Sequence, residues 1–415
     1  MPLLAIQDSL DELAQLADTA GIEVVGRDYQ RLDRYNAATM IGSGKLQDVK
    51  EQLAETGAST LIFDDELSPR HQRELEKALG EDVKVLDRTA LILDVFARHA
   101  RTHEGSLQVE LAQYQYRLPR LTRQWTHLAR QAGGGAARGG VGGVGLRGPG
   151  ETQLEVDRQA IGKRISYIKA GLKKVRAHRE RHRAQRKKTG ISVVAIVGYT
   201  NAGKSTLLNA LTGAGVLVAD KLFATLDPTT RRCALSGKRE VLFTDTVGFI
   251  QKLPTQLVAA FRATLEEVTE ADVLLHVLDV THPHAQAQAL AVEQTLDQLG
   301  VTGIPQVTAL NKIDRLAEEE RGSLSGEWVD GLSHAVPISA RAKEGLDELL
   351  ARVEKVLYEQ MTPMHVLLPY RASELVAIFH KHGIVEQIQH TSDGVKIVGR
   401  LPGRLVTNYR RYLVQ

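Results

Sequence analysis

Residues 198–205 have the composition and spacing of a phosphate-binding loop. They read Gly-Tyr-Thr-Asn-Ala-Gly-Lys-Ser, which matches the pattern G-x-x-x-x-G-K-[ST]. An apolar, β-branched run over 191–197 precedes them and helix-forming residues over 206–211 follow. In such a strand–loop–helix unit, the backbone N–H groups and the helix dipole surround phosphate oxygens. The sequence therefore predicts nucleotide binding by Gly198, Tyr199, Thr200, Asn201, Ala202, Gly203, Lys204 and Ser205.

Three downstream motifs, each after a strand-like run, indicate which nucleotide binds. In the D-x-x-G motif at 245–248, we expect Asp245 to face a Mg²⁺ shell and the Gly248 N–H to meet a γ-phosphate. In the N-K-x-D motif at 311–314, the Asp314 carboxylate can accept N1–H and N2–H₂ of guanine, a donor pair that adenine lacks. Ser339 and Ala340 can offer a backbone N–H to guanine O6. The order of the motifs predicts a GTP-binding domain with contacts from Asp245, Thr246, Val247, Gly248, Asn311, Lys312, Ile313, Asp314, Ser339, Ala340 and Arg341.

A threonine between the phosphate loop and D-x-x-G should bind Mg²⁺ and the γ-phosphate and form a switch that collapses on hydrolysis. Thr225, Thr229 and Thr230 compete for this role. A turn around Asp227 and Pro228 would explain Thr229 and Thr230 as structural residues that have no role in nucleotide binding. We favour Thr225 and expect nucleotide contacts from Phe223, Ala224, Thr225, Leu226 and Asp227.

Phosphoryl transfer depends mainly on positioning and charge neutralisation. We assign catalytic roles to Lys204, Thr225 and Gly248. Many GTPases place a water-orienting glutamine directly after D-x-x-G, but this chain has Phe249 there. Gln251 could serve only if the loop were unusually arranged. We expect Phe249 to be buried and intrinsic GTP hydrolysis to be slow. Catalysis should then need a contribution from outside this motif.

Several of these segments resemble the HflX family of ribosome-associated GTPases. The resemblance rests on 198–206, on Phe-Ala-Thr-Leu-Asp-Pro-Thr at 223–229 and on Asp-Thr-Val-Gly-Phe-Ile at 245–250. Arg-Gly-Pro-Gly-Glu-Thr-Gln-Leu-Glu at 147–155 is similar to a signature of that family. The resemblance implies Mg²⁺ bound by Ser205 and Thr225. It also implies a ribosomal partner, chiefly the large subunit and its rRNA.

The formal net charge of +3 hides an uneven distribution. Residues 101–188 contain 20 Lys+Arg and 6 Asp+Glu, a net charge of +14, so the rest of the chain carries −11. Residues 163–188 alone contain 12 Lys+Arg and one acid. A solvated helix face would contain acids for pairing, so phosphate contacts to nucleic acid are favoured. Tyr167 alone could stack on a base here, which favours recognition of backbone and shape.

The same segment predicts an antiparallel helical hairpin. Apolar residues alternate at spacings of four and three over 107–128 and again over 154–175. Pro119 should kink the first arm. The connecting residues 133–150 include ten glycines and should form a long flexible tip. A linker without function is the alternative for the tip.

The fold class expected is α/β. Residues 1–100 should form a small α/β domain, 101–188 the basic hairpin, 189–360 a P-loop GTPase domain and 361–415 a small α+β domain. In the first domain, Ile-Gly-Ser-Gly-Lys at 41–45 has the wrong spacing for a second phosphate loop and is interpreted as a glycine turn. The single cysteine, Cys233, excludes a disulfide framework. The same cysteine usage fits a reducing cytosol. No apolar run approaches the roughly eighteen residues of a membrane span. We expect a cytoplasmic monomer with at most peripheral membrane association.

Two hypotheses of different class follow. In one, the chain is an enzyme whose GTP cycle splits or remodels the ribosome while the hairpin contacts rRNA. In the other, it is a GTP-gated RNA-binding module in which hydrolysis is only a release timer.

Overall fold

The computed structural model describes residues 6–80, 82–121, 149–189, 191–213, 222–223, 226, 228–235, 240–252, 267–324 and 332–414. The chain divides into two compact units, one with residues 1–175 and 252–261 and the other with 176–251 and 262–415. Among the described residues, no helix is both long and apolar enough to cross a membrane.

The N-terminal unit begins with a small α/β fold around a two-stranded parallel sheet. Its elements are α1 (Ile6–Thr19), α2 (Ser43–Thr56), β1 (Thr60–Phe63), α3 (Pro69–Leu79), β2 (Lys84–Asp87) and α4 (Arg88–His99). The start of α3 has the cap that its sequence favours: the Ser68 hydroxyl accepts a hydrogen bond from His71 N at 3.1 Å, and Pro69 is the first helical residue. The glycine turn expected at 41–45 is instead the start of α2, with Gly42 at its N-cap.

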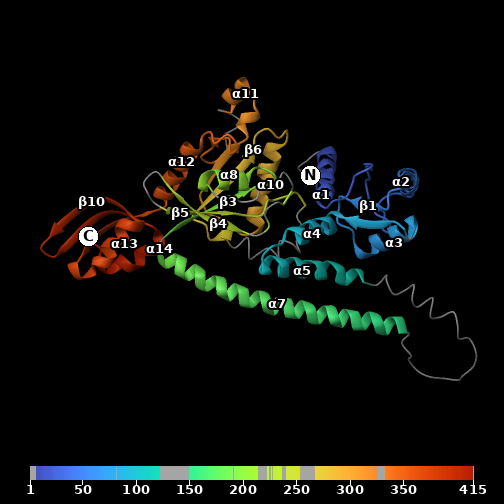
Figure 1. Ribbon diagram of the computed structural model, residues 1–415, viewed down its shortest axis with the longest axis horizontal. Coiled ribbons are helices and arrows are strands. Elements are labelled where there is room, and N and C mark those ends of the chain that lie inside the picture. Colours follow the sequence, from blue (N-terminus) through green and yellow to red (C-terminus); the bar gives the residue numbers. More distant parts are fainter. Residues whose placement is uncertain are drawn as a thin grey trace, which may run out of the picture. The chain divides into compact units, whose positions relative to one another are not determined.

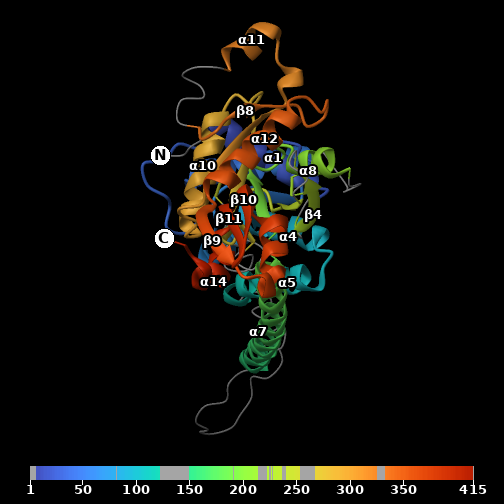
Figure 2. The same cartoon turned by 90° about the vertical axis from the view of Figure 1, so that its left-hand side faces the viewer.

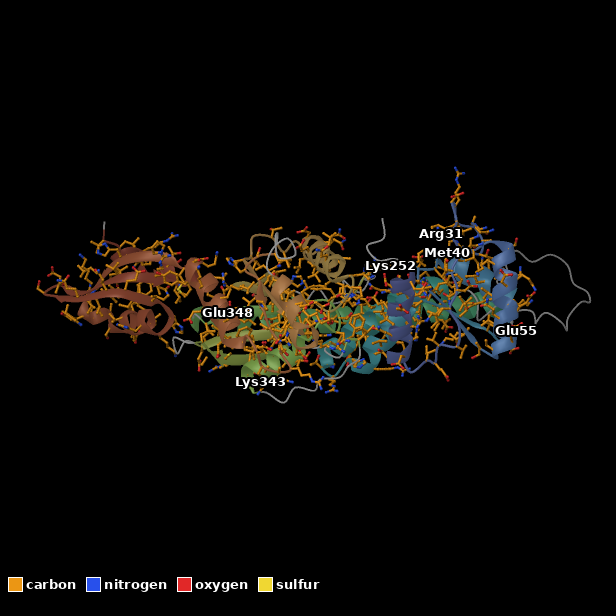
Figure 3. All side chains as sticks on the ribbon, turned by 90° about the horizontal axis from the view of Figure 1, so that it is seen from above. Arg31, Met40, Glu55, Lys252, Lys343 and Glu348 are labelled. Carbon is orange, nitrogen blue, oxygen red and sulfur yellow. The ribbon has the colours of Figure 1, made fainter. Side chains whose placement is uncertain are left out.

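A buried ion cluster connects the helices of this fold. The Arg88 guanidinium, 2% exposed, pairs with Glu12 of α1 and with Asp64, the latter at 2.6 Å. Lys252, labelled in Figure 3, belongs to the same unit and pairs with Asp64 at 2.6 Å. Burial alone would raise the pKa of the Asp64 carboxyl, but Arg88 and Lys252 hold it below its usual value.

The helical hairpin consists of α5 (His103–Arg117), the 3₁₀ turn η1 (Leu118–Arg120) and α7 (Pro149–Thr189). Figure 1 shows α7 as one continuous helix. The seam predicted from the heptads is formed by Leu107, Leu111, Tyr114, Ile165, Ile168 and Leu172. α5 ends at Arg117, and Pro119 lies in the 3₁₀ turn that follows. The expected kink of the first arm stays a prediction, because the arm beyond residue 121 lies outside the described residues. The expected seam residues Trp125 and Leu128, and tip residues 133–148, lie outside the described residues.

The second unit contains a six-stranded sheet in the order β4-β5-β3-β6-β7-β8. Only β4 runs antiparallel to its neighbour. Side chains of α8 and α12 share one core with the sheet, whereas α10 packs on alternate positions of β6 and β7, on the other face. Figure 2 shows α11 standing out from the sheet. The elements are β3 (Ser192–Gly198), α8 (Lys204–Thr212), β4 (Thr229–Ala234), β5 (Glu240–Asp245), β6 (Val273–Asp279), α10 (Ala285–Gln298), β7 (Gln306–Asn311), η3 (Ile313–Arg315), α11 (Glu318–Ser323), β8 (Val336–Pro337) and α12 (Leu346–Glu359).

The end of the chain forms a three-stranded antiparallel sheet in the order β10-β11-β9. Two helices cover one face, where Phe379 and Tyr409 meet edge to face at 5.6 Å. The α+β fold expected here is confirmed. Its elements are β9 (Thr362–Leu368), η4 (Tyr370–Ala372), α13 (Ser373–His382), β10 (Ile384–Thr391), β11 (Gly394–Leu401), α14 (Gly403–Tyr409) and η5 (Arg410–Tyr412).

Candidate nucleotide-binding site

The polar motifs meet at one edge of the six-stranded sheet. β3 ends at Gly198, β5 at Asp245, β6 at Asp279 and β7 at Asn311. These four strands are parallel and neighbouring, so their carboxyl ends lie side by side, which is where α/β sheets bind ligands.

The phosphate loop connects β3 directly to α8. Lys204, the first residue of α8, donates from Nζ to the Tyr199 carbonyl oxygen at 2.7 Å and is 7% exposed. Burial lowers the pKa of its ammonium to about 8, although the Asp245 carboxylate opposes the shift. The buried hydroxyl of Thr200 has no hydrogen-bond partner among the described residues. A buried polar group without a partner is unfavourable, so this hydroxyl fits a ligand or water.

Ser205 and Asp245 lie together, as the motifs require. The Ser205 hydroxyl donates to Asp245 Oδ2 at 2.6 Å, which joins the start of α8 to the end of β5. A hydroxyl and a carboxylate at this distance form an all-oxygen donor set. Such a set fits Mg²⁺, which prefers few protein oxygens together with substrate phosphates and water.

Asn311, the first residue of the N-K-x-D motif, connects this motif to the phosphate loop. Its Nδ2 donates to the Ala202 carbonyl at 2.8 Å, and its Oδ1 accepts from Ala340 N at 3.0 Å. Gly203 permits this approach, because a Cβ there would lie 2.3 Å from Asn311 Nδ2. Asn311 therefore connects the phosphate loop to the loop that contains Ala340.

The remaining base-side residues are also paired. The Ser339 hydroxyl donates to Asp314 Oδ1 at 2.6 Å and accepts from Ala342 N at 2.9 Å. Lys312 pairs with Asp279 at 2.6 Å. Asp279 was not expected at the site from the sequence, although its position directly after the mostly apolar run 273–278 could have indicated it.

The segment after D-x-x-G is attached to the phosphate loop. Phe249 N donates to the Gly198 carbonyl at 3.1 Å, and Thr200 N donates to the Phe249 carbonyl at 2.8 Å. Gln251 N donates to the Tyr199 hydroxyl at 2.9 Å. This side-chain bond was not expected from the sequence.

Gly248 allows the attachment. A Cβ at this position would lie 2.9 Å from Thr200 Cγ2 and 3.0 Å from Lys204 Nζ. Phe249 is 2% exposed, so its expected burial is confirmed.

Thr225, with Ala224 and Asp227, lies outside the described residues. The turn that was the alternative for the competing threonines includes Asp227 and so lies partly outside the described residues. Thr229 and Thr230 begin β4, and the Thr230 hydroxyl lies 3.0 Å from that of Thr244.

His276 is fully buried in β6, and burial lowers the pKa of its imidazole to about 4. The ring is therefore neutral at physiological pH and belongs to the core.

This fold and site define a P-loop GTPase. Family models match residues 7–97 (GTP-binding GTPase N-terminal), 99–186 (GTP-binding GTPase Middle Region), 193–312 (50S ribosome-binding GTPase) and 325–413 (HflX C-terminal domain). The GTPase HflX of Caldanaerobacter subterraneus subsp. tengcongensis is 45% identical over 98% of this chain and 91% of that protein. The GTPase HflX of Escherichia coli K12 is 40% identical over 98% of this chain and 92% of its own length. The chain belongs to the HflX family of GTPases, and its enzymatic class is GTP hydrolase.

A solved structure of a GTP-binding protein from the hyperthermophilic archaeon Sulfolobus solfataricus in complex with GDP is similar to this chain. It is 26% identical, covers 85% of this chain and 96% of its own, and has a TM-score of 0.44.

Proposed function

We propose that the chain associates with the ribosome in the cytoplasm, chiefly with the large subunit, and uses its GTP cycle to split or remodel it. The observation that carries the proposal is the basic arm α7. Its Lys163 and Lys174 lie on the side opposite the apolar seam, and Lys169 and Lys173 are exposed at the flank of the seam. Phosphate contacts from such an arm supply affinity for RNA without reading its sequence. The name of the model that matches 193–312, a 50S ribosome-binding GTPase, supports the same partner.

We assign the nucleotide contacts as the motifs predict. The Lys204 ammonium neutralises β/γ-phosphate oxygens, and the Gly248 N–H meets the γ-phosphate. The Asp314 carboxylate reads the guanine edge. The carboxylate already accepts the Ser339 hydroxyl, which orients it, and the unpartnered Thr200 hydroxyl supports a phosphate nearby.

In this proposal, Ser205 and Thr225 would hold Mg²⁺, and Asp245 would support it through water. The short bond between Ser205 and Asp245 supports the assignment, since both oxygens can turn to a shared cation. When bound there, Mg²⁺ would supply neutralisation of the charge that develops during phosphoryl transfer.

Hydrolysis by the isolated chain should be slow, because Phe249 stands where a glutamine would orient water and is buried. Phosphate release from GTP, measured with and without purified ribosomal particles, tests this. We expect a rise of at least tenfold with particles. Equal rates would contradict activation by the ribosome.

The alternative is a binding module in which hydrolysis only times release. The buried Phe249 in place of a water-orienting glutamine, from which we expect slow hydrolysis, favours it. A GTP analogue that cannot be cleaved separates the two functions in sedimentation of 70S particles. A remodelling enzyme splits the particles once with the analogue, whereas a binding module stays bound to intact ones.

A further inference from the structure

We propose that Tyr167, on the outward face of α7, stacks on an unpaired base of the RNA that this helix binds. The inference rests on the proposed function and adds a defined contact to it. Recognition by phosphate contacts alone would not need an aromatic side chain at this place.

The position of Tyr167 follows from helix geometry. Ile165, Ile168 and Leu172 face the seam with α5. Lys163, Tyr167, Ala170 and Lys174 are spaced by four, three and four residues, so they form one stripe away from that seam, and all four are exposed. Tyr167 therefore lies between two lysines, next to a small residue that permits close approach.

A fixed arginine supports the tyrosine ring. Arg164 donates from Nε and Nη2 to the two oxygens of Glu110 on α5, at 2.8 and 2.9 Å. The same guanidinium lies 5.3 Å from the centre of the Tyr167 ring. Because a bidentate pair fixes the guanidinium in orientation, the ring above it is held in place while the side chain stays 67% exposed.

The surroundings of Tyr167 favour RNA as its partner. Between 163 and 174 the helix has five Lys+Arg and no acid. Tyr35 is also 67% exposed, but the chain around it mixes arginines with aspartates at 27–34. The two tyrosines are therefore equally exposed, but only Tyr167 of the two lies among basic residues without acids. Stacking platforms within positive surfaces are typical of proteins that bind single-stranded nucleic acid.

The test compares affinity for purified large ribosomal subunits at several KCl concentrations, with a non-hydrolysable GTP analogue present. We expect Tyr167→Ala to weaken binding roughly five- to 150-fold, the range covered by one stacked base. The salt slope should stay unchanged, since no phosphate contact is lost. Tyr167→Phe should bind within about twofold of wild type. Lys163→Gln with Lys174→Gln should instead reduce the slope by about two.

Tyr35→Ala is the matched control and should bind like wild type. If Tyr167→Ala also binds like wild type, the stacking inference is wrong while ribosome binding stands. If wild type itself does not bind the subunits, the proposed function fails. Loss of binding by Tyr167→Ala to vesicles of anionic phosphatidylglycerol, with ribosome binding intact, would assign this face to a lipid surface and overturn the inference.

Discussion

At the scale of single residues, we expect Asp314 to carry the discrimination between bases. The Ser339 hydroxyl fixes its carboxylate at 2.6 Å. Asp314→Asn places a donor against guanine's own donors, and the mismatch should cost several kcal/mol because buried polar groups lose their partners. Xanthine carries an acceptor in place of the N2 amino group, so XTP should bind the variant better than GTP. Titration with labelled GTP, ATP and XTP measures this. Equal binding of ATP and GTP by wild type would disprove the assignment.

Lys204 should make nucleotide binding depend on pH. Its pKa is about 8 in the folded chain and 10.5 in an unfolded one, so folding favours loss of the proton and the free energy of unfolding rises with pH between these values. Nucleotide phosphates favour the charged form. Binding should therefore take up a proton, and affinity for GDP should fall about tenfold from pH 7 to pH 9. Calorimetric titration in two buffers of different ionisation enthalpy reports both quantities. Affinity that does not change with pH would contradict the titration of Lys204.

Tyr199 should act as a positioning residue through its hydroxyl. Tyr199→Phe removes the bond to Gln251 N and leaves the ring in place, which loosens the segment that carries the Gly248 N–H. We expect kcat for GTP to fall about two- to tenfold while affinity for GDP stays unchanged. Tyr370→Phe is the matched control, because it removes a comparable bond to the Thr391 carbonyl, remote from the site. An unchanged kcat would reduce Tyr199 to a packing residue.

At the scale of elements, Arg88 should hold α1 against α4. Arg88→Ala leaves Glu12 and Asp64 buried without their main partner, which should destabilise these helices by about 3–5 kcal/mol. Arg98→Ala, also on α4, breaks an exposed pair with Asp94 and should change stability by less than about 1 kcal/mol. Hydrogen exchange of α1 and α4 amides measures each opening free energy. Equal effects of the two variants would contradict a structural role for the cluster.

The same cluster predicts the response to acid. The lowered pKa of Asp64 means that its stabilising contribution is present above pH 4 and is lost as the pH falls through the folded value. The opening free energy of the α1 amides, taken after correction for the intrinsic exchange rate at each pH, should therefore fall in wild type as the pH falls below 4. In Arg88→Ala, Asp64 keeps Lys252 but loses Arg88, so this dependence on pH should be weaker than in wild type.

Elements with strong local signals could be predicted from the sequence. The α3 cap at Ser68 and Pro69, the heptad seam and the β10–β11 pair all follow from short-range patterns. α2 could not be predicted, because the two glycines at 42 and 44 disfavour a helix start and the helix buries only Val49. The burial of Arg88 was equally hidden, since its partners Glu12 and Asp64 are distant in sequence.

Within the site, each motif could be assigned because a strand precedes it. The contacts between the motifs could not be predicted from the sequence. The bond from Gln251 to Tyr199 and the brace from Asn311 to Ala202 depend on how neighbouring strands place their loops. Such long-range geometry leaves no local pattern.

At the scale of the whole molecule, the net +14 of residues 101–188 on an otherwise acidic chain predicts ribosome binding that weakens steeply with salt. Within the hairpin, the arm and the tip should have separable roles. Replacing Lys173, Lys174, Arg179 and Arg183 by Gln should weaken attachment itself and reduce the salt slope by about four. Sedimentation with large subunits at several salt concentrations measures both effects.

Deletion of 133–145 should have the opposite effect. The deletion removes no described core residue, so GTP binding and unfolding should stay close to wild type. Binding through the arm should survive in part, because its lysines remain, while splitting of 70S particles should stop. The two variants therefore control for each other: one loses attachment and the other loses remodelling. If the chain without its tip splits particles at the wild-type rate, the glycine-rich segment is a linker. Other parts of the molecule must then be responsible for the splitting.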